Sequence, residues 1–183
     1  MKSDQTKWDF KYLQKASILS KPDQFFCDSI KLFCGNTILD LAGGDGKNSI
    51  YFLQSNFDVT LLDISIEGIK RVKQNYLEIK TIQMDLDNLN LVAQLPKFDN
   101  IIISYFKPSY DLWKLLPDLL NSKGKIFFHT FHIDQHYQKG FSKRFCLENN
   151  EFTYLSKEIK QVQHNKAEID GNHIDCSIFE KIK

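Results

Sequence analysis

Short apolar runs alternate with amphipathic stretches along the chain from residue 37 onward. The apolar runs predict buried strands, because several are rich in β-branched residues. They cover residues 37–41, 58–63, 81–85, 98–105 and 125–131. The amphipathic stretches predict helices over residues 49–53, 65–76 and 112–119, the last interrupted or restarted at Pro117. Strands that alternate with helices are typical of a parallel sheet covered on both faces.

The two ends of the chain depart from this alternation. The first 36 residues predict helices: Trp8 and Tyr12 recur at helical spacing, and Pro22 suits a first helical position. An apolar stripe follows, which comprises Phe25, Phe26, Ile30 and Phe33. Near the other end, residues 158–163 and 173–182 predict two strands. The linker between them, which contains Asp170-Gly171, is too short for a crossover helix, so we expect an antiparallel pair.

Size and composition favour one soluble domain. The chain has 183 residues and 42% hydrophobic residues, which suffices for a core. Its net charge of +1 argues against a nucleic-acid binder, and only Arg71 and Arg144 are arginines, so forked anion clamps are scarce. No apolar stretch approaches the roughly 18 residues of a membrane span, and the first ten residues lack the apolar core of a secretory signal. The four cysteines form no C-x-x-C pair, so we expect a reducing, cytoplasmic setting.

The most informative segment is a glycine loop between a strand and a helix, at residues 38–49 (ILDLAGGDGKNS). Such a loop lets a ligand approach the backbone and the free N–H groups of the helix. Alone it is weak support for a ligand site, because a plain turn has the same composition. Asp63 and Asp85 strengthen the case, since each ends a predicted strand at the edge where such sheets bind ligands. Asp63 would reach the hydroxyls of a ribose, so a nucleoside-containing ligand is favoured.

A carboxylate inside the first predicted strand narrows the choice of ligand. The residues Gly44, Gly46 and Ser49 loosely match a dinucleotide fingerprint, which leaves an NAD-dependent oxidoreductase as one alternative. However, Asp40 directly before the loop would repel a pyrophosphate. It suits a ligand with a cationic head, such as S-adenosylmethionine, which has an ammonium, a sulfonium and a ribose but no phosphate.

These residues resemble the class I S-adenosylmethionine-dependent methyltransferases. The resemblance covers the loop at residues 40–46, the strand ends Asp63-Ile64-Ser65 and Asp85-Leu86, and the strand opening at residues 98–101. Ala42 stands where the family loop has its first glycine. The resemblance implies a Rossmann-like sheet of seven strands in the order 3-2-1-4-5-7-6, with the last strand antiparallel. Residues 37–183 would form the cofactor-binding core and residues 1–36 an N-terminal helical cover.

A narrower resemblance, to the small bacterial methyltransferases of the tellurite-resistance and thiopurine type, extends over most of the chain. It rests on residues 46–49, 59–65, 128–131 and 145–151. The chain departs from that pattern at Lys47 (usually Arg), at His129 (usually acidic) and at Ser122-Lys123-Gly124 (usually with a Pro-Gly pair). These departures concern the substrate more than the fold.

The resemblance also assigns candidate site residues. Asp40 would lie near the methionine end of S-adenosylmethionine, Asp63 would bind the ribose hydroxyls, and Ile64 would pack on the adenine. Asp85 and the backbone of Leu86 would bind the adenine edge, and Ser104 and Tyr105 would border the methyl group and its acceptor. The full set of cofactor-binding candidates is Asp40, Ala42, Gly43, Gly44, Gly46, Asn48, Asp63, Ile64, Asp85, Leu86 and Ser104.

The catalytic candidates are Tyr105 and His129, both on the substrate side. His129, His132 and His136 resemble a metal-ligand cluster. Residues 129 and 132 would nevertheless point to opposite faces of a strand, so no metal is expected. Trp8, Tyr12, Phe25 and Phe26 would either cover the pocket or pack the helices onto the sheet, and the sequence leaves both open.

The expected reaction is direct displacement at the cofactor methyl group. A small acceptor such as a thiol or a metalloid would receive the methyl group, with S-adenosylhomocysteine as the product. A thiolate needs no general base, so the lack of a catalytic triad is compatible with an enzyme. A cofactor-binding protein without catalysis remains an alternative. We expect a monomer or weak homodimer that acts on a small molecule, without nucleic-acid or membrane partners.

Overall fold

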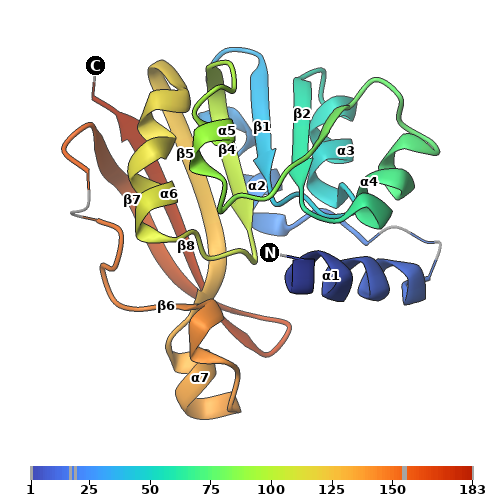
Figure 1. Ribbon diagram of the computed structural model, residues 1–183. Coiled ribbons are helices and arrows are strands. Elements are labelled where there is room, and N and C mark those ends of the chain that lie inside the picture. Colours follow the sequence, from blue (N-terminus) through green and yellow to red (C-terminus); the bar gives the residue numbers. More distant parts are fainter. Residues whose placement is uncertain (1, 17, 19, 154–155, 183) are drawn as a thin grey trace.

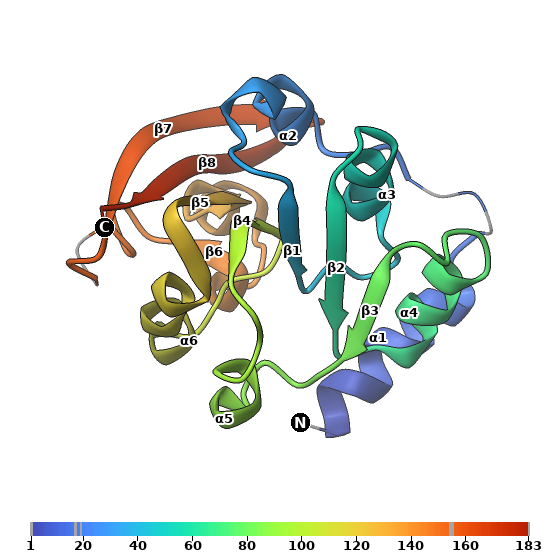
Figure 2. The ribbon, with the colours of Figure 1, turned by 90° about the horizontal axis from the view of Figure 1, so that it is seen from above.

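A mixed β-sheet runs through the centre of the protein, and helices cover both of its faces (Figures 1 and 2). The computed structural model describes residues 2–16, 18, 20–153 and 156–182. Residues 1, 17 and 19 of the expected cover, and residues 154, 155 and 183 of the expected core, lie outside them. The strands of the described part are β1 (Thr37–Leu41), β2 (Asp58–Asp63), β3 (Lys80–Gln83), β4 (Phe98–Ser104), β5 (Leu120–His132), β6 (Cys146–Leu147), β7 (Ile159–Ile169) and β8 (Asn172–Lys181).

The strand order is β3-β2-β1-β4-β5-β8-β7, which confirms the predicted Rossmann-like topology. The first five strands pair in parallel, while β8 is antiparallel to both β5 and β7. The two-residue strand β6, which pairs only with the end of β5, is an addition to the seven strands predicted. Strands β2 and β3 lie on one side of β1, and β4 and β5 lie on its other side, so the strand order reverses direction at β1. Ligands of such sheets bind at this reversal, outside the carboxyl ends of the strands.

Helices lie on the two sheet faces, and each face has its own apolar core. Ile38, Leu61 and Phe127 face helices α2, α3 and α4, whereas Leu39, Ile103 and Phe128 face α5 and α6. Figure 2 shows these two layers on opposite sides of the sheet. The helices of the described part are α1 (Lys2–Gln14), α2 (Gln24–Asp28), η1 (Ile30–Leu32), α3 (Lys47–Gln54), α4 (Ile66–Lys73), α5 (Leu89–Val92), α6 (Tyr110–Leu115), η2 (Leu116–Leu119), α7 (Asp134–Lys139) and η3 (Lys143–Phe145). None of them is long and apolar enough to cross a membrane.

Several element boundaries differ from the predicted ones. Pro22 is not the first residue of a helix: Asp23 is the N-cap, and its N–H is bonded to Asn48 Oδ1 at 2.9 Å, so α2 begins at Gln24. Strand β3 ends at Gln83, two residues early, because Asp85 turns the chain by accepting the N–H of Asp87. Strand β5 begins at Leu120, five residues early, because Leu120 still pairs with Phe98 across an irregularity.

The C-terminal hairpin forms as predicted but is longer. Strands β7 and β8 pair from Ile159 to Lys181, and Asp170 and Gly171 form the two-residue turn. Both turn residues have positive φ, +50° and +71°, as a type I′ turn requires. The hairpin buries the edge of β5 and extends the sheet.

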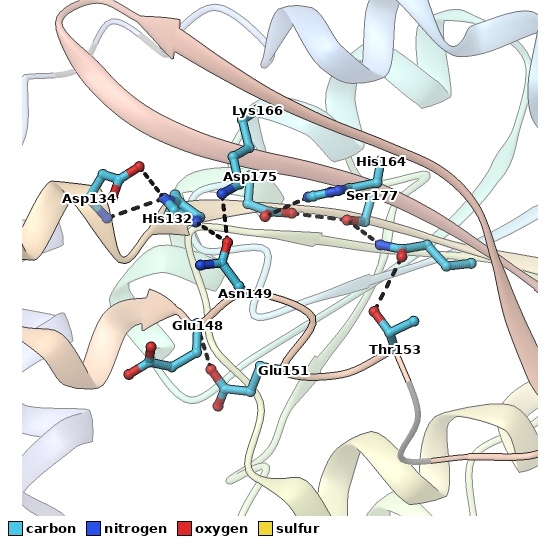
Figure 3. A network of polar contacts seen from close by, with 11 residues as sticks. His132, Asp134, Glu148, Asn149, Glu151, Thr153, His164, Lys166, Asp175 and Ser177 are labelled. Carbon is cyan, nitrogen blue, oxygen red and sulfur yellow. Dashed lines mark hydrogen bonds and ion pairs between the residues drawn. The ribbon is translucent and has the colours of Figure 1, made fainter.

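A polar network joins this hairpin to the loop that follows β6 (Figure 3). His132 at the end of β5 contacts Asn149 Oδ1 at 3.1 Å, and Lys166 of β7 donates to the same oxygen. On β8 the buried Asp175 contacts His164 at 2.9 Å and accepts from Ser177. The network therefore helps to fix the loop that follows β6.

The turn between β1 and α3 adopts the left-handed backbone conformation at three positions. Gly44 and Gly46 have φ of +61° and +79°, and Ala42 has φ of +58°. Glycine adopts this conformation freely, whereas an L-residue such as alanine is strained there. Ala42 is therefore a position of this loop where glycine would be free of strain.

This strain predicts that one substitution by glycine increases the stability of the protein, although such substitutions usually decrease it. We expect Ala42→Gly to raise the free energy of unfolding by up to about 1 kcal/mol, because relief of the left-handed strain outweighs the greater freedom of the unfolded chain. Ala93→Gly is the control: Ala93 is exposed with φ of −63°, so its replacement should lower stability by about 0.5–1 kcal/mol. Urea unfolding of both variants measures the effect, and a loss of stability in Ala42→Gly equal to that in Ala93→Gly would contradict it.

Candidate functional site

A cavity of about 380 Å³ opens at the sheet edge where β1, β2 and β4 end. Helix α1 lies across this edge, as Figure 1 shows. The cavity gathers nearly all of the predicted site residues: Asp40, Ala42, Gly43, Gly44, Asn48, Asp63, Ile64, Asp85, Leu86, Ser104 and Tyr105 line it. Gly46 and His129 are the two predicted residues that are not among its lining residues.

Asp40 brings an incompletely bonded carboxylate to the cavity. Its side chain is 1% exposed, and Oδ2 accepts a hydrogen bond from Ser49 Oγ at 2.7 Å. Oδ1 is buried without a hydrogen-bond partner. Burial raises the pKa of Asp40 to about 7, against the hydrogen bond from Ser49, and the neighbouring Asp63 adds to the rise. A buried acceptor without a hydrogen-bond donor lowers the stability of the folded protein, and a ligand that supplies a donor would remove this cost.

Asp63 is fixed by the backbone around it. Its Oδ2 accepts the N–H of Gly44 and its Oδ1 the N–H of Ser65, both at 2.8 Å. Burial raises the pKa of Asp63 above its usual value, although both hydrogen bonds act in the opposite direction. A carboxylate oxygen has further lone pairs beyond one N–H bond. Asp63 can therefore hold its position and still accept from a ligand in the cavity.

Two glycines keep the loop close to these carboxylates. A Cβ at Gly43 would lie 2.7 Å from the carboxyl carbon of Asp40, and one at Gly44 would lie 2.1 Å from the Tyr12 hydroxyl oxygen. No larger residue fits without a shift of its neighbours. Ile64, Asp85 and Leu86 line the same cavity from the turns after β2 and β3.

Asp23 joins three parts of the site, and sequence reasoning missed this role. It forms an ion pair with Lys47, accepts from Asn48 Nδ2 at 2.9 Å and accepts from Ser104 Oγ. These hydrogen bonds and the Lys47 charge lower the pKa of Asp23, although its burial acts the other way. An N-cap residue after Pro22 was the available signal, but nothing local to the sequence indicates partners from α3 and β4.

Helix α1 is clamped onto the cavity by polar contacts that the sequence did not reveal either. Lys15 forms an ion pair with the buried Asp45 at 2.6 Å. Arg71 of α4 lies 3.5 Å from the same carboxylate and donates to the carbonyls of Lys15 and Ala16. Asp9 accepts from Ser65 Oγ at 2.6 Å, at the N-terminus of α4.

The four N-terminal aromatic residues divide between the two roles that the sequence left open. Trp8 and Tyr12 line the cavity from α1, with ring centroids 6.1 Å apart. Phe25 and Phe26 instead lie in the core between α2 and the sheet, 9% and 0% exposed. Phe25 and Phe26 therefore pack the helices onto the sheet, whereas Trp8 and Tyr12 lie at the cavity, where their role as a cover stays a prediction.

Tyr105 and His129 occupy different depths. Tyr105 lines the cavity with a strained φ of +51°, and its N–H donates to the carbonyl of His129. The His129 ring is 1% exposed and lies behind it, among Phe25, Phe26 and Tyr105, with both ring nitrogens unpartnered. Burial lowers the pKa of His129 to about 4 and raises that of Tyr105 to about 12, so neither is charged at neutral pH.

The other two histidines of the cluster lie in separate surroundings. His132 contacts Asn149 and Asp134, on the sheet face opposite His129, and His136 contacts the carbonyl of Phe141 at 2.7 Å. Within the described residues, no three His, Cys, Asp or Glu side chains are grouped to hold a metal ion.

Comparison with known proteins identifies this architecture. Residues 38–122 match a family described as a methyltransferase domain. No curated protein matches the chain. Among solved structures, TehB from Haemophilus influenzae superposes with a TM-score of 0.73 at 16% identity, covering 95% of this chain and 67% of that one. The N-methyltransferase NodS from Bradyrhizobium japonicum WM9, in complex with S-adenosyl-L-homocysteine, gives 0.68 at 14% identity, covering 87% and 85%.

A third similar structure is the plantazolicin methyltransferase BpumL, in complex with a pentazolic desmethylPZN analog and S-adenosylhomocysteine. Its TM-score is 0.70 at 14% identity, and the superposition covers 98% of this chain and 91% of that one. At these identities the superpositions establish the fold, and the match over residues 38–122 establishes the type of domain. Residues 38–122 therefore resemble a methyltransferase domain, and the chain shares the fold of S-adenosylmethionine-dependent methyltransferases.

The cavity fits S-adenosylmethionine chemically. The unpartnered Oδ1 of Asp40 can accept from the ammonium of S-adenosylmethionine, and the Asp63 carboxylate has capacity for ribose hydroxyls. A pyrophosphate would instead meet two buried carboxylates, an unfavourable pairing that argues against a dinucleotide.

The titration of Asp40 predicts a pH dependence of cofactor binding. Because its pKa lies near 7 in the free protein, Asp40 is mostly protonated below that pH and ionised above it. The ammonium of S-adenosylhomocysteine prefers the ionised form. Its affinity should therefore rise about tenfold from about pH 6 to about pH 8, and binding near pH 7 should release a proton.

Calorimetric titration in two buffers of different ionisation enthalpy measures both effects. The control is Asp40→Asn, which keeps the oxygen that Ser49 bonds but cannot titrate. Its affinity should be weaker and nearly independent of pH over this range. A variant that retained the wild-type slope would assign the pH dependence to another group, such as Asp63.

Proposed function

We propose that this protein is an S-adenosylmethionine-dependent methyltransferase and that it transfers the methyl group to a small, soft acceptor, either a thiolate or a reduced metalloid. The observation that carries the proposal is the burial of His129 behind Tyr105, outside the lining of the cavity, with both side chains uncharged at neutral pH. Tyr105 has a pKa of about 12 and holds its proton, and His129 has a pKa of about 4 and accepts one poorly. Neither suits the deprotonation of an amine or a hydroxyl. An acceptor that arrives with an available lone pair needs no such help.

The proposed cofactor site uses the carboxylates at the strand ends. Asp63 binds the ribose hydroxyls and Asp40 the ammonium of the methionine part. Ile64 packs on the adenine, and Asp85 and the backbone N–H of Leu86 bind the adenine edge. The lining of one cavity by all five residues supports these assignments.

The chain's own contribution to the reaction is positioning and exclusion of water. S-adenosylmethionine, when bound, supplies a methyl group on a sulfonium; the acceptor lone pair forms the new bond, and the electrons of the broken bond leave with the neutral sulfur of S-adenosylhomocysteine. Ser104 and Tyr105 border the reacting end, and His129 supports the Tyr105 ring from behind. Residues 1–36 act as the cover of the core formed by residues 37–183, because the Trp8 and Tyr12 rings of α1 line the cavity.

The choice of acceptor predicts how the rate depends on pH. With thiols of different acidity, the rate should follow the ionisation of each thiol rather than one enzyme group, because only the thiolate attacks. Mass spectrometry of methylated products, with S-adenosylmethionine saturating, gives the profiles for a panel of thiols, selenite, amines and phenols. Turnover of amines or phenols alone would overturn the soft-acceptor proposal. Binding of the cofactor without turnover of any compound would favour the non-catalytic alternative.

Removal of the Asp63 charge should weaken cofactor binding in a folded protein. Asp63→Ala is expected to cost about 1.5–3 kcal/mol of affinity for S-adenosylhomocysteine, as for a hydrogen bond to a charged group. Asp63→Asn keeps one acceptor oxygen for the loop and should lose about tenfold. Asp58→Asn, at the exposed start of β2, is the matched control and should bind normally. Unchanged affinity in a folded Asp63→Asn protein would remove Asp63 from the cofactor site.

A further inference from the structure

The cavity has a basic and aromatic side that cofactor binding does not explain. Four cationic side chains line it: Lys11, Lys15, Lys47 and Arg144. Two of them are already neutralised, since Lys15 pairs with Asp45 at 2.6 Å and Lys47 pairs with Asp23 at 2.5 Å. Within the described residues, Lys11 and Arg144 have no carboxylate partner. They are therefore the two cations of the lining that remain available to a ligand.

These two cations converge from segments that are far apart in the sequence. Lys11 Nζ lies 4.3 Å from the centroid of the Trp8 ring, on α1. The Arg144 guanidinium lies 4.4 Å from the centroid of the Phe145 ring, in η3. Lys7 Nζ of α1 lies 5.4 Å from the same Phe145 ring, so the two segments meet there. Partial burial lowers the pKa of Lys11, and the charges of Lys15 and Lys7 lower it further, whereas the charge of Asp45 acts in the opposite direction.

The segment that presents Arg144 is held in place rather than loose. Lys107, two residues after Tyr105, donates to the carbonyl of Cys146 at 2.8 Å and pairs with Glu151 at the same distance. His132 fixes Asn149 in the same loop (Figure 3). The contrast with Arg71 is informative, because Arg71 is occupied by the carbonyls of Lys15 and Ala16.

Acidic residues also line the cavity, but most lie elsewhere in it. Asp40 and Asp63 belong to the strand ends, and Asp85 and Asp87 to the turn after β3. Asp4 is the acidic lining residue on α1, and Lys7 follows it by three residues on the same helix. Asp45 also lines the cavity, but Lys15 and Arg71 already pair with it. The side with Lys11 and Arg144 thus keeps a positive character, and each of these cations lies over an aromatic ring, Trp8 or Phe145.

We propose that the acceptor carries an anionic group on a flat apolar body, away from the accepting atom, and that Lys11 and Arg144 bind this anion. The aromatic rings of Trp8, Phe145 and Tyr105 take the body, and the accepting atom faces Ser104. This inference rests on the proposed function, since it names the acceptor class of the same site. Lys11 and Arg144 are then specificity-determining residues that touch the substrate but not the reacting atoms.

Binding of unreactive product analogues tests the charge preference directly. The probes are 4-(methylthio)benzoate and its neutral counterpart 4-(methylthio)benzamide, titrated calorimetrically into protein saturated with S-adenosylhomocysteine. The wild type should bind the benzoate about tenfold more tightly than the benzamide. Lys11→Gln and Arg144→Gln should each remove most of this preference and leave the affinity for S-adenosylhomocysteine unchanged. With 4-mercaptobenzoate as the acceptor, both should raise KM and leave kcat nearly unchanged.

Conservative variants and a distant control separate charge from packing. Arg144→Gln removes the charge and also changes the contact with the Phe145 ring. Arg144→Lys and Lys11→Arg keep the charge, so both should keep the preference for the benzoate. Lys73→Gln, on the exposed face of α4, should behave as the wild type. Equal affinity for the two probes, or binding of neither beside bound S-adenosylhomocysteine, overturns the inference alone. Failure of S-adenosylhomocysteine itself to bind would count against the proposed function instead.

Discussion

The burial of Asp40 and Asp63 at adjoining strand ends is the constraint on which the rest of the site depends. Each lies at or near the carboxyl end of a parallel strand, under 7% exposed, and the charge of Asp63 raises the pKa of Asp40. Backbone N–H groups satisfy Asp63 on both oxygens, whereas Asp40 keeps one oxygen without a partner. A folded protein keeps such an arrangement at a cost in stability, and a cationic nucleoside ligand removes that cost.

The covering segment is built around the same centre. Helix α1 is attached through Lys15 to Asp45 of the glycine loop and through Asp9 to Ser65, two residues after Asp63. Asp23 attaches the next segment to Lys47 and to Ser104 at the end of β4. The N-terminal segment therefore contacts the loop and two strand ends at once. Binding in the cavity and the position of α1 are linked by these contacts, because the same residues belong to both.

Much of the fold and of the cofactor side could be predicted from the sequence, for local reasons. The β-branched run at residues 101–103 and the Asp170-Gly171 turn each encode their structure within a few residues. Asp63 and Asp85 could be identified because they follow predicted strands whose ends a parallel sheet brings together. Ala42 was recognised as a departure, and its φ of +58° gives the physical reason.

The remaining features depend on partners distant in the chain. Asp23 bonds residues 24 to 81 positions away, and Arg144 reaches the cavity through a loop held by Lys107 and His132. No local pattern encodes such pairings. His129 pairs with Ser104 in the sheet, but the sequence could not show that Phe25 and Tyr105 enclose it. Its catalytic role, like that of Tyr105, stays a prediction.

Titration of the protein with S-adenosylmethionine and, separately, with NAD tests the central claim most directly. The buried carboxylates Asp40 and Asp63 should select a phosphate-free, cationic nucleoside. Isothermal titration of the ligand-free protein at about pH 8, where the pKa of Asp40 leaves it ionised, should show micromolar binding of S-adenosylmethionine and no detectable binding of NAD. Micromolar binding of NAD without binding of S-adenosylmethionine would contradict the account.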